Sequence, residues 1–166
     1  GSAMMVQSLA TIETKIFAGT QAGVYLSTDN GSNWVAVNNG LSGNSLMVNS
    51  LAVSSSNIYA STSNGVFKSS DNGDNWTAIN NGLTFPYSVM QITAFKNSIY
   101  VRANDGLFLS IDNGEHWVKA DNGLPNTTIM QTIVKGNTVL AATANGVFLS
   151  EDNGSHWTAV NNGLTS

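Results

Sequence analysis

The chain has 166 residues, of which 42% are hydrophobic and only 10% are charged, and its formal net charge at pH 7 is -4. This length suffices for one well-cored domain or a short array of repeats. The acidic balance and the single arginine argue against nucleic-acid binding, which requires clustered Lys and Arg. The absence of cysteine excludes disulfides and thiolate metal sites, and no apolar run reaches the roughly 20 residues of a membrane-spanning helix.

Four similar units follow one another along the chain. Residues 1–4 are interpreted as the remnant of an expression tag, and the units are predicted to span 5–45, 46–87, 88–127 and 128–164. Tryptophan recurs at positions 34, 76, 117 and 157, and two series of glycines keep the same spacing. Because the spacing of all three series changes by the same amount from unit to unit, these residues indicate a true tandem repeat of about 41 residues. The one-residue difference between the second and third units is predicted to lie in a hairpin loop, where AVSSSNIYA corresponds to AFKNSIYV.

Each unit is predicted to contain four short strands and no helix. In the second unit, VNSLAVS and NIYAST are separated by a polar turn, GVFKSS follows an Asn-Gly pair, and WTAIN precedes the exit segment NNGL. Asn-Gly between β-rich runs is a strong hairpin signal. A period of 40 to 45 residues with four strands is typical of a β-propeller blade. The predicted fold class is therefore all-β, a propeller with four blades per chain; a β-solenoid, with its shorter repeat, is the alternative.

One octapeptide, S-x-D-x-G-x-x-W, occurs in every unit. It is STDNGSNW from Ser27, SSDNGDNW from Ser69, SIDNGEHW from Ser110 and SEDNGSHW from Ser150. This pattern resembles the Asp-box, or bacterial neuraminidase repeat, of sialidases, xyloglucan-cleaving glycosidases, sortilin-like receptors and photosystem assembly factors. The resemblance covers nearly the whole chain and implies a β-propeller whose boxes close the hairpin between the third and outermost strands. It implies no particular activity, because enzymes and binding proteins both carry the box.

The residue types of the box suit a structural role. A carboxylate can accept N–H groups of its own turn, glycine permits positive φ, a hydroxyl can tie the loop to its base, and the indole can be buried. A catalytic group acts in one place, whereas these residues recur once per blade. We therefore predict that the box residues are structural and that all four tryptophans are buried. The residues concerned are Ser27, Asp29, Gly31, Trp34, Ser69, Asp71, Gly73, Trp76, Ser110, Asp112, Gly114, Trp117, Ser150, Asp152, Gly154 and Trp157.

The remaining residues offer little for catalysis. Sialidases, as the resemblance implies, hold a substrate carboxylate with three arginines, whereas Arg102 is the only arginine here. Glycosidases generally need two carboxylates that flank the bond, and two of the three glutamates lie inside boxes. His116 and His156 occupy the same box position on adjacent blades, too far apart to share a zinc ion. We predict no enzymatic activity, no cofactor and no metal.

The differences between blades indicate a recognition surface instead. The loop LTFPYSV after the second blade has the counterparts LSGNSLM and LPNTTIM, and two charged residues of the third blade replace Ser61 and Asn64. Loops of this kind lie opposite the boxes in Asp-box propellers. The predicted patch consists of Phe85, Tyr87, Arg102 and Asp105. The alternative is a loop that packs its own aromatic side chains.

The function favoured by the sequence is a non-catalytic scaffold or binding module, or a recombinant or engineered blade fragment. Two alternatives stay open: a carbohydrate-binding lectin or glycosidase-related propeller, and an assembly factor that binds another protein. The predicted ligand is accordingly a glycan or a protein, with no nucleic acid and no membrane. The family resemblance favours a secreted or periplasmic location over the cytoplasm.

The outer blades also predict self-association. Repeat arrays that end in solvent normally carry polar capping units, but KIFAGT in the first blade and TVLAATANGVFLS in the last are as apolar as the inner blades. Two chains joined head to tail would form an eight-bladed homodimer with two-fold symmetry. A closed four-bladed monomer is the alternative.

Overall fold

A computed structural model describes residues 4–83, 88–125, 129–136 and 138–164. Its strands form four antiparallel four-stranded sheets, each built from strands that are consecutive in the chain. The first two sheets contain β1 (Val6–Ile12), β2 (Lys15–Thr20), β3 (Gly23–Ser27), β4 (Val35–Ala36), β5 (Val48–Ser54), β6 (Asn57–Thr62), β7 (Gly65–Ser69) and β8 (Thr77–Ala78). The last two contain β9 (Val89–Phe95), β10 (Ser98–Ala103), β11 (Gly106–Ser110), β12 (Val118–Lys119), β13 (Ile129–Lys135), β14 (Thr138–Thr143), β15 (Gly146–Ser150) and β16 (Thr158–Ala159). The all-β propeller fold predicted from the repeat is confirmed.

Two details differ from the sequence prediction. A 3-10 helix, η1 (Gly43–Leu46), lies between the first and second blades; at four residues it is too short to leave a helical period in the sequence. The hairpins β5–β6 and β9–β10 have turns of equal length, from Ser54 to Asn57 and from Phe95 to Ser98. The one-residue difference therefore lies in the connection between blades and not in the hairpin, because the hairpin must preserve the strand register.

The hydrophobic core lies between consecutive blades. Phe17 and Val24 of the first blade pack against Ile58, Phe67 and Trp76 of the second. A second cluster joins the second blade to the third, and a third cluster joins the third to the fourth. Side chains of successive residues point to opposite faces of a strand, so each inner blade contributes one face to each of two clusters.

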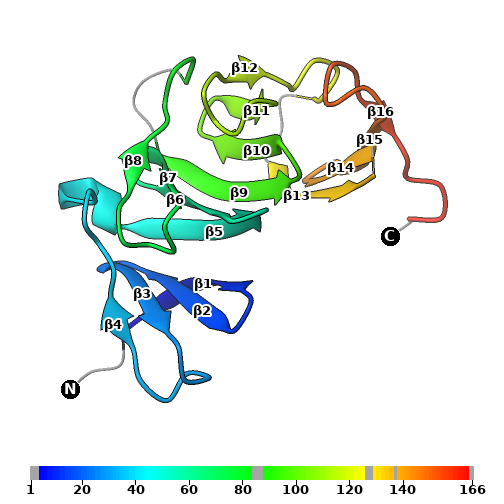
Figure 1. Cartoon of the computed structure of the whole chain (residues 1–166). Coiled ribbons are helices and arrows are strands. Elements are labelled where there is room, and N and C mark those ends of the chain that lie inside the picture. Colours follow the sequence, from blue (N-terminus) through cyan, green and yellow to red (C-terminus); the bar gives the residue numbers. More distant parts are fainter. Residues whose placement is uncertain (1–3, 84–87, 126–128, 137, 165–166) are drawn as a thin grey trace.

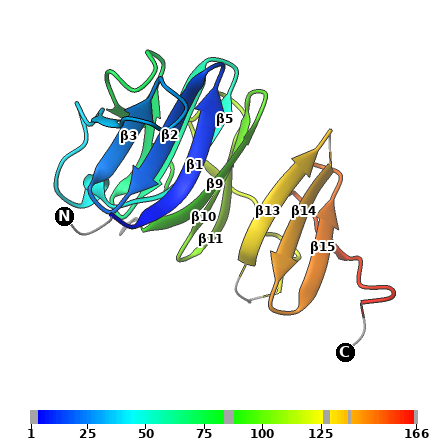
Figure 2. The same ribbon diagram turned by 90° about the horizontal axis from the view of Figure 1, so that it is seen from below.

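The four blades form an open arc. The first sheet, β1–β4, and the last sheet, β13–β16, lie at opposite ends of the array in both views (Figures 1 and 2). Each end of the arc therefore presents a sheet face that no other described blade covers. In the part of the chain that the structure describes, no helix has the length and apolar character needed to cross a membrane.

Candidate functional site

The hairpin that carries the octapeptide forms the same polar network in every blade. In the second blade, the Ser69 hydroxyl donates to Asp71 Oδ1 at 2.8 Å and accepts the backbone N–H of Gly73 at 2.8 Å. The Asp71 carboxylate also accepts the backbone and side-chain N–H groups of Asn75 at 2.9 and 2.8 Å. Asn72 and Gly73 both have positive φ, 61° and 91°, as the tight turn requires. The carboxylate is thus engaged within its own hairpin.

Histidine replaces this asparagine in the last two blades. Nδ1 of His116 lies 2.8 Å from Asp112 Oδ2, and Nδ1 of His156 lies 2.7 Å from Asp152 Oδ2. Hydrogen bonds from the Ser110 hydroxyl and from His116 hold the pKa of Asp112 well below its usual range. Those from His156 and the Ser150 hydroxyl lower the pKa of Asp152 to about 2. Each serine hydroxyl donates to the carboxylate and not to the imidazole, an order that differs from that of a serine-protease triad.

The box tryptophans join one blade to the preceding one. The indole Nε1 of Trp76 donates to the carbonyl of Val37 at 2.8 Å, and Trp157 donates to Ala120 at 2.9 Å. The predicted burial is correct for Trp76, Trp117 and Trp157, but it is wrong for Trp34, which is 40% exposed. Trp34 belongs to the first described blade, and no other described blade covers its indole.

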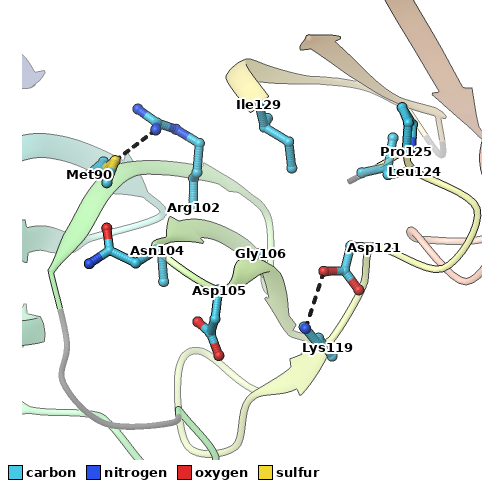
Figure 3. A pocket seen from close by; sticks show the side chains of 11 residues that line it. Met90, Arg102, Asn104, Asp105, Gly106, Lys119, Asp121, Leu124, Pro125 and Ile129 are labelled. Carbon is cyan, nitrogen blue, oxygen red and sulfur yellow. Dashed lines mark hydrogen bonds and ion pairs between the residues drawn. The ribbon is translucent and has the colours of Figure 1, made fainter. Parts of the chain in front are cut away.

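A cleft of about 710 Å³ lies between the third and fourth blades. It opens beside the turn between β10 and β11, and Leu124, Pro125 and Ile129 lie on its far side (Figure 3). Its lining residues include Met90, Arg102, Asn104, Asp105, Lys119, Asp121, Leu124, Pro125 and Ile129. The cleft therefore combines charged groups from the third blade with apolar side chains from both blades.

The charges of this cleft are specific to the third blade. Arg102, Asp105, Lys119 and Asp121 occupy repeat positions that carry no charged residue in any other blade. At the position of Asp121 the other blades have asparagine, whose side-chain oxygen accepts a backbone N–H of the third strand at 2.7 Å in each case. Asp121 instead lies 3.6 Å from Lys119 Nζ. The third blade thus departs from the repeat at the very positions that line the cleft.

Arg102 is the most unusual of these residues. Its Nη1 lies 2.8 Å from the sulfur of Met90, while its Nε is buried and has no hydrogen-bond partner among the described residues. Burial lowers the pKa of the guanidinium. In the part of the chain that the structure describes, no carboxylate lies within ion-pair distance of it. The guanidinium therefore has donor capacity available for an acceptor brought by a ligand.

Only two of the four residues of the predicted recognition patch lie in the described part of the chain. Arg102 and Asp105 both line the cleft, whereas Phe85 and Tyr87 lie outside the described residues. Sequence reasoning missed Lys119 and Asp121. The signal was available, because a comparison of the four units shows aspartate at position 121 where the others have asparagine.

Metal binding finds no support in the described ranges 4–83, 88–125, 129–136 and 138–164. Within them, no three His, Cys, Asp or Glu side chains gather closely enough to hold an ion. Asp112 and His116 form a pair, and so do Asp152 and His156, but neither pair gains a third ligand of these types.

Comparison with family models decides the family. The model of the DUF6242 beta propeller domain matches residues 7–139 and, in a second overlapping match, residues 72–165. The chain belongs to this family. A sequence comparison with curated proteins found no significant match.

Several solved structures share the fold of this DUF6242 domain. YCF48 bound to D1 peptide has a TM-score of 0.70 at 18% identity over 93% of this chain and 54% of that one. The GH74 enzyme of Niastella koreensis has a TM-score of 0.73 at 20% identity over 96% of this chain and 30% of that one. The computationally designed Ika4 protein has a TM-score of 0.71 at 12% identity over 92% of this chain and 94% of that one.

At such identities the likeness shows the fold alone. The DUF6242 domain described here spans about half of YCF48 and less than a third of the GH74 enzyme. The set includes both enzymes and proteins that are not described as enzymes, so the shared fold leaves the activity to be argued from the site itself.

Proposed function

We propose that this DUF6242 domain is a non-catalytic binding scaffold that holds an acidic segment of a partner protein in the cleft between its third and fourth blades. The observation that carries the proposal is the Arg102 guanidinium, whose Nε is buried without a hydrogen-bond partner among the described residues. A buried donor that lacks an acceptor costs about 1–3 kcal/mol. A ligand carboxylate that accepts from Nε and Nη2 together recovers this free energy and adds a charge-assisted pair.

The rest of the cleft suits a peptide. Met90, Leu124 and Pro125 supply apolar contact area, and the Lys119–Asp121 pair supplies both a donor and an acceptor for main-chain groups of a ligand. A core of apolar contacts with a polar rim is the usual composition of a protein-binding site. The cleft is also open enough, at about 710 Å³, to take several residues of an extended segment.

The comparison with YCF48 supports the choice of a peptide ligand. A protein of similar fold is known in a complex with the D1 peptide, so a propeller of this type can bind a polypeptide segment. The assignment to the present chain rests on the charges of its third blade and not on that likeness.

The absence of catalysis is part of the proposal. Each box carboxylate is held by hydrogen bonds within its own hairpin, an arrangement that fits a structural role better than proton transfer. The same network supports assigning the repeats to the Asp-box type. The homodimer predicted from the sequence also belongs to the proposal.

Glycan binding is the second candidate, and the likeness to GH74 enzymes favours it. The two candidates differ in the group that Arg102 contacts. A neutral glycan offers hydroxyl groups, whereas an acidic peptide offers a carboxylate.

A peptide array with matched pairs tests the proposal. Each acidic peptide is printed beside a version in which Asp is replaced by Asn and Glu by Gln, and a glycan array and a panel of aryl glycosides are assayed with the same protein. We expect binding to acidic peptides that weakens by about 10- to 100-fold in both Arg102→Ala and the amide peptides. Lys135→Ala, which removes an exposed cation from the end of β13 outside the cleft, is the matched control and keeps full affinity.

Three results contradict the proposal. Peptide binding that survives Arg102→Ala removes the cleft as the site. Binding to neutral glycans without binding to acidic peptides favours the second candidate. Turnover of any aryl glycoside contradicts the non-catalytic role.

A further inference from the structure

The outward face of the first blade exposes residues that are buried in every other blade. We name Val6, Leu9 and Trp34 the leading face. Their exposed fractions are 51%, 63% and 40%, whereas those of Val48, Leu51 and Trp76, the equivalent residues of the second blade, are 1%, 6% and 4%. The side chains are thus of the kind that this fold covers with a preceding blade.

The outward face of the fourth blade is the other half of the same interface. We name Leu140, Val147, Val160 and Leu164 the trailing face. Leu164 is 62% exposed and Val160 is 40% exposed. The equivalents of Leu164 in the first two blades, Leu41 and Leu83, are both 7% exposed, and the three equivalents of Val147 are fully buried: Val24, Val66 and Leu107.

The three interfaces within the chain show how such faces fit together. At each one the box indole donates to a carbonyl of the preceding blade, with Nε1–O distances of 2.8, 2.6 and 2.9 Å. At the first two interfaces the tryptophan also donates its backbone N–H. That of Trp76 donates to the carbonyl of Asn39 at 2.8 Å, and that of Trp117 donates to the carbonyl of Asn81 at 2.9 Å. By repeat equivalence, the acceptors for Trp34 are the carbonyls of Val160 and Asn162.

A glycine completes each internal interface. An added Cβ at Gly40 would lie 2.1 Å from the carbonyl oxygen of Trp76, and one at Gly82 would lie 2.3 Å from that of Trp117. Gly163 is the equivalent residue of the fourth blade and has a similar φ of +84°, yet no described residue lies within 4 Å of the position of its Cβ. The trailing face therefore keeps the space in which a tryptophan backbone fits, and none of the described residues fills it.

We propose that the leading face of one chain binds the trailing face of a second copy, with Trp34 of each chain seated on Val160 and Gly163 of the other. The occupant is a second copy because the leading face matches, by repeat position, the face that packs on a trailing face at each internal interface, and the trailing face matches its counterpart in the same way. The two faces also lie at opposite ends of the open arc (Figure 2). Two such contacts related by a two-fold axis close a ring of eight blades and leave no apolar face uncovered. This interface lies outside the Arg102 cleft, so it stands or fails independently of the proposed ligand.

The solution mass of the full chain and of charge variants tests the interface. By sedimentation equilibrium we expect about twice the 17.4 kDa of one chain. Leu9→Asp and Leu164→Asp each place a carboxylate in the interface and reduce the mass to that of a monomer, with an unchanged β-sheet circular dichroism spectrum. Val118→Asp is the matched control, because Val118 is as exposed as Leu9, at 61%, but lies on neither face; it stays dimeric.

Mixing the two variants distinguishes a head-to-tail contact from other contacts. A Leu9→Asp chain has an intact trailing face and a Leu164→Asp chain has an intact leading face, so an equimolar mixture forms one native interface and sediments as a 1:1 pair. Quenching of Trp34 fluorescence by acrylamide falls as the wild-type chain associates, because Trp34 becomes buried.

A monomeric wild type at micromolar concentration overturns the proposal, as does a mass of three or more chains. A dimer that persists in both Leu9→Asp and Leu164→Asp also overturns it, since its interface then lies elsewhere. A mixture of the two variants that stays monomeric contradicts the head-to-tail arrangement.

Discussion

The indole Nε1 of Trp117 donates a hydrogen bond to the backbone carbonyl of Ile79 at 2.6 Å and so ties the third blade to the second. The indole is 3% exposed, and its own backbone N–H donates to the carbonyl of Asn81 at 2.9 Å. One residue of the hairpin thus joins two blades through both its side chain and its main chain.

Removal of the indole N–H should therefore weaken the array. Trp117→Phe keeps most of the apolar area but leaves the Ile79 carbonyl without its donor, and we expect the free energy of unfolding to fall by about 1–3 kcal/mol in chemical denaturation. Trp34→Phe is the comparison. We expect its cost to depend on protein concentration, because the proposed association of two chains buries Trp34. An unchanged stability of Trp117→Phe would show that the hydrogen bond contributes nothing.

The buried serine of the box should matter more than exposed serines. Ser69 is 1% exposed, and its hydroxyl serves both Asp71 and the N–H of Gly73. Ser69→Ala leaves that N–H without an acceptor and should reduce the free energy of unfolding by about 1–3 kcal/mol. Ser32→Ala, at an exposed position of the first box, should change it by less than about 0.5 kcal/mol. Equal effects of the two substitutions would contradict the assigned role of the hydroxyl.

The low pKa of Asp152 predicts a loss of stability in acid. Its carboxyl has a pKa of about 2 in the folded chain, compared with the ordinary 3.8, because the folded state stabilises the charged form. The resulting contribution is fully present above the unfolded-state pKa and is lost as the pH falls from about 4 to about 2. In thermal unfolding from pH 5 to pH 1.5, Asp152→Asn should show a flatter pH dependence than the wild type.

The matched control for this pH experiment is Asp74→Asn. Asp74 is exposed in the second box, and its carboxylate makes no hydrogen bond to another described residue. We expect its melting curve to follow the wild-type pH dependence. Parallel curves for Asp152→Asn and the wild type would show that hydrogen bonds in the box do not hold the carboxylate in its charged form.

A buried tyrosine should be replaceable by phenylalanine. The hydroxyl of Tyr100 is buried without a hydrogen-bond partner among the described residues, and burial raises its pKa to about 12. Phe17 occupies the equivalent position of the first blade and is fully buried. Tyr100→Phe should therefore maintain the melting temperature or raise the free energy of unfolding by about 1 kcal/mol. A loss of stability in this variant would show that a bound water or another group satisfies the hydroxyl.

The sequence by itself determined the blade. The spacing of its four tryptophans and its Asn-Gly pairs predicted four units of four strands, because hairpin geometry depends on residues that lie close together in the chain. The polar network of the box is local for the same reason, since Ser69, Asp71 and Asn75 lie within seven positions.

The tertiary structure decided what lies between blades. The exposure of Trp34 could not be predicted from its box, because that box follows the same pattern as the boxes whose tryptophans are buried. Burial of the indole depends instead on whether another blade covers that face of the sheet. The cleft likewise brings Arg102 of β10 together with Ile129 of β13, two residues of different sheets whose distance depends on how those sheets pack. The hydrogen bonds of a hairpin form between residues that are close in the sequence, so the sequence pattern predicts them. An interface between sheets forms between residues that are distant in the sequence, so it depends on the relative position of the sheets.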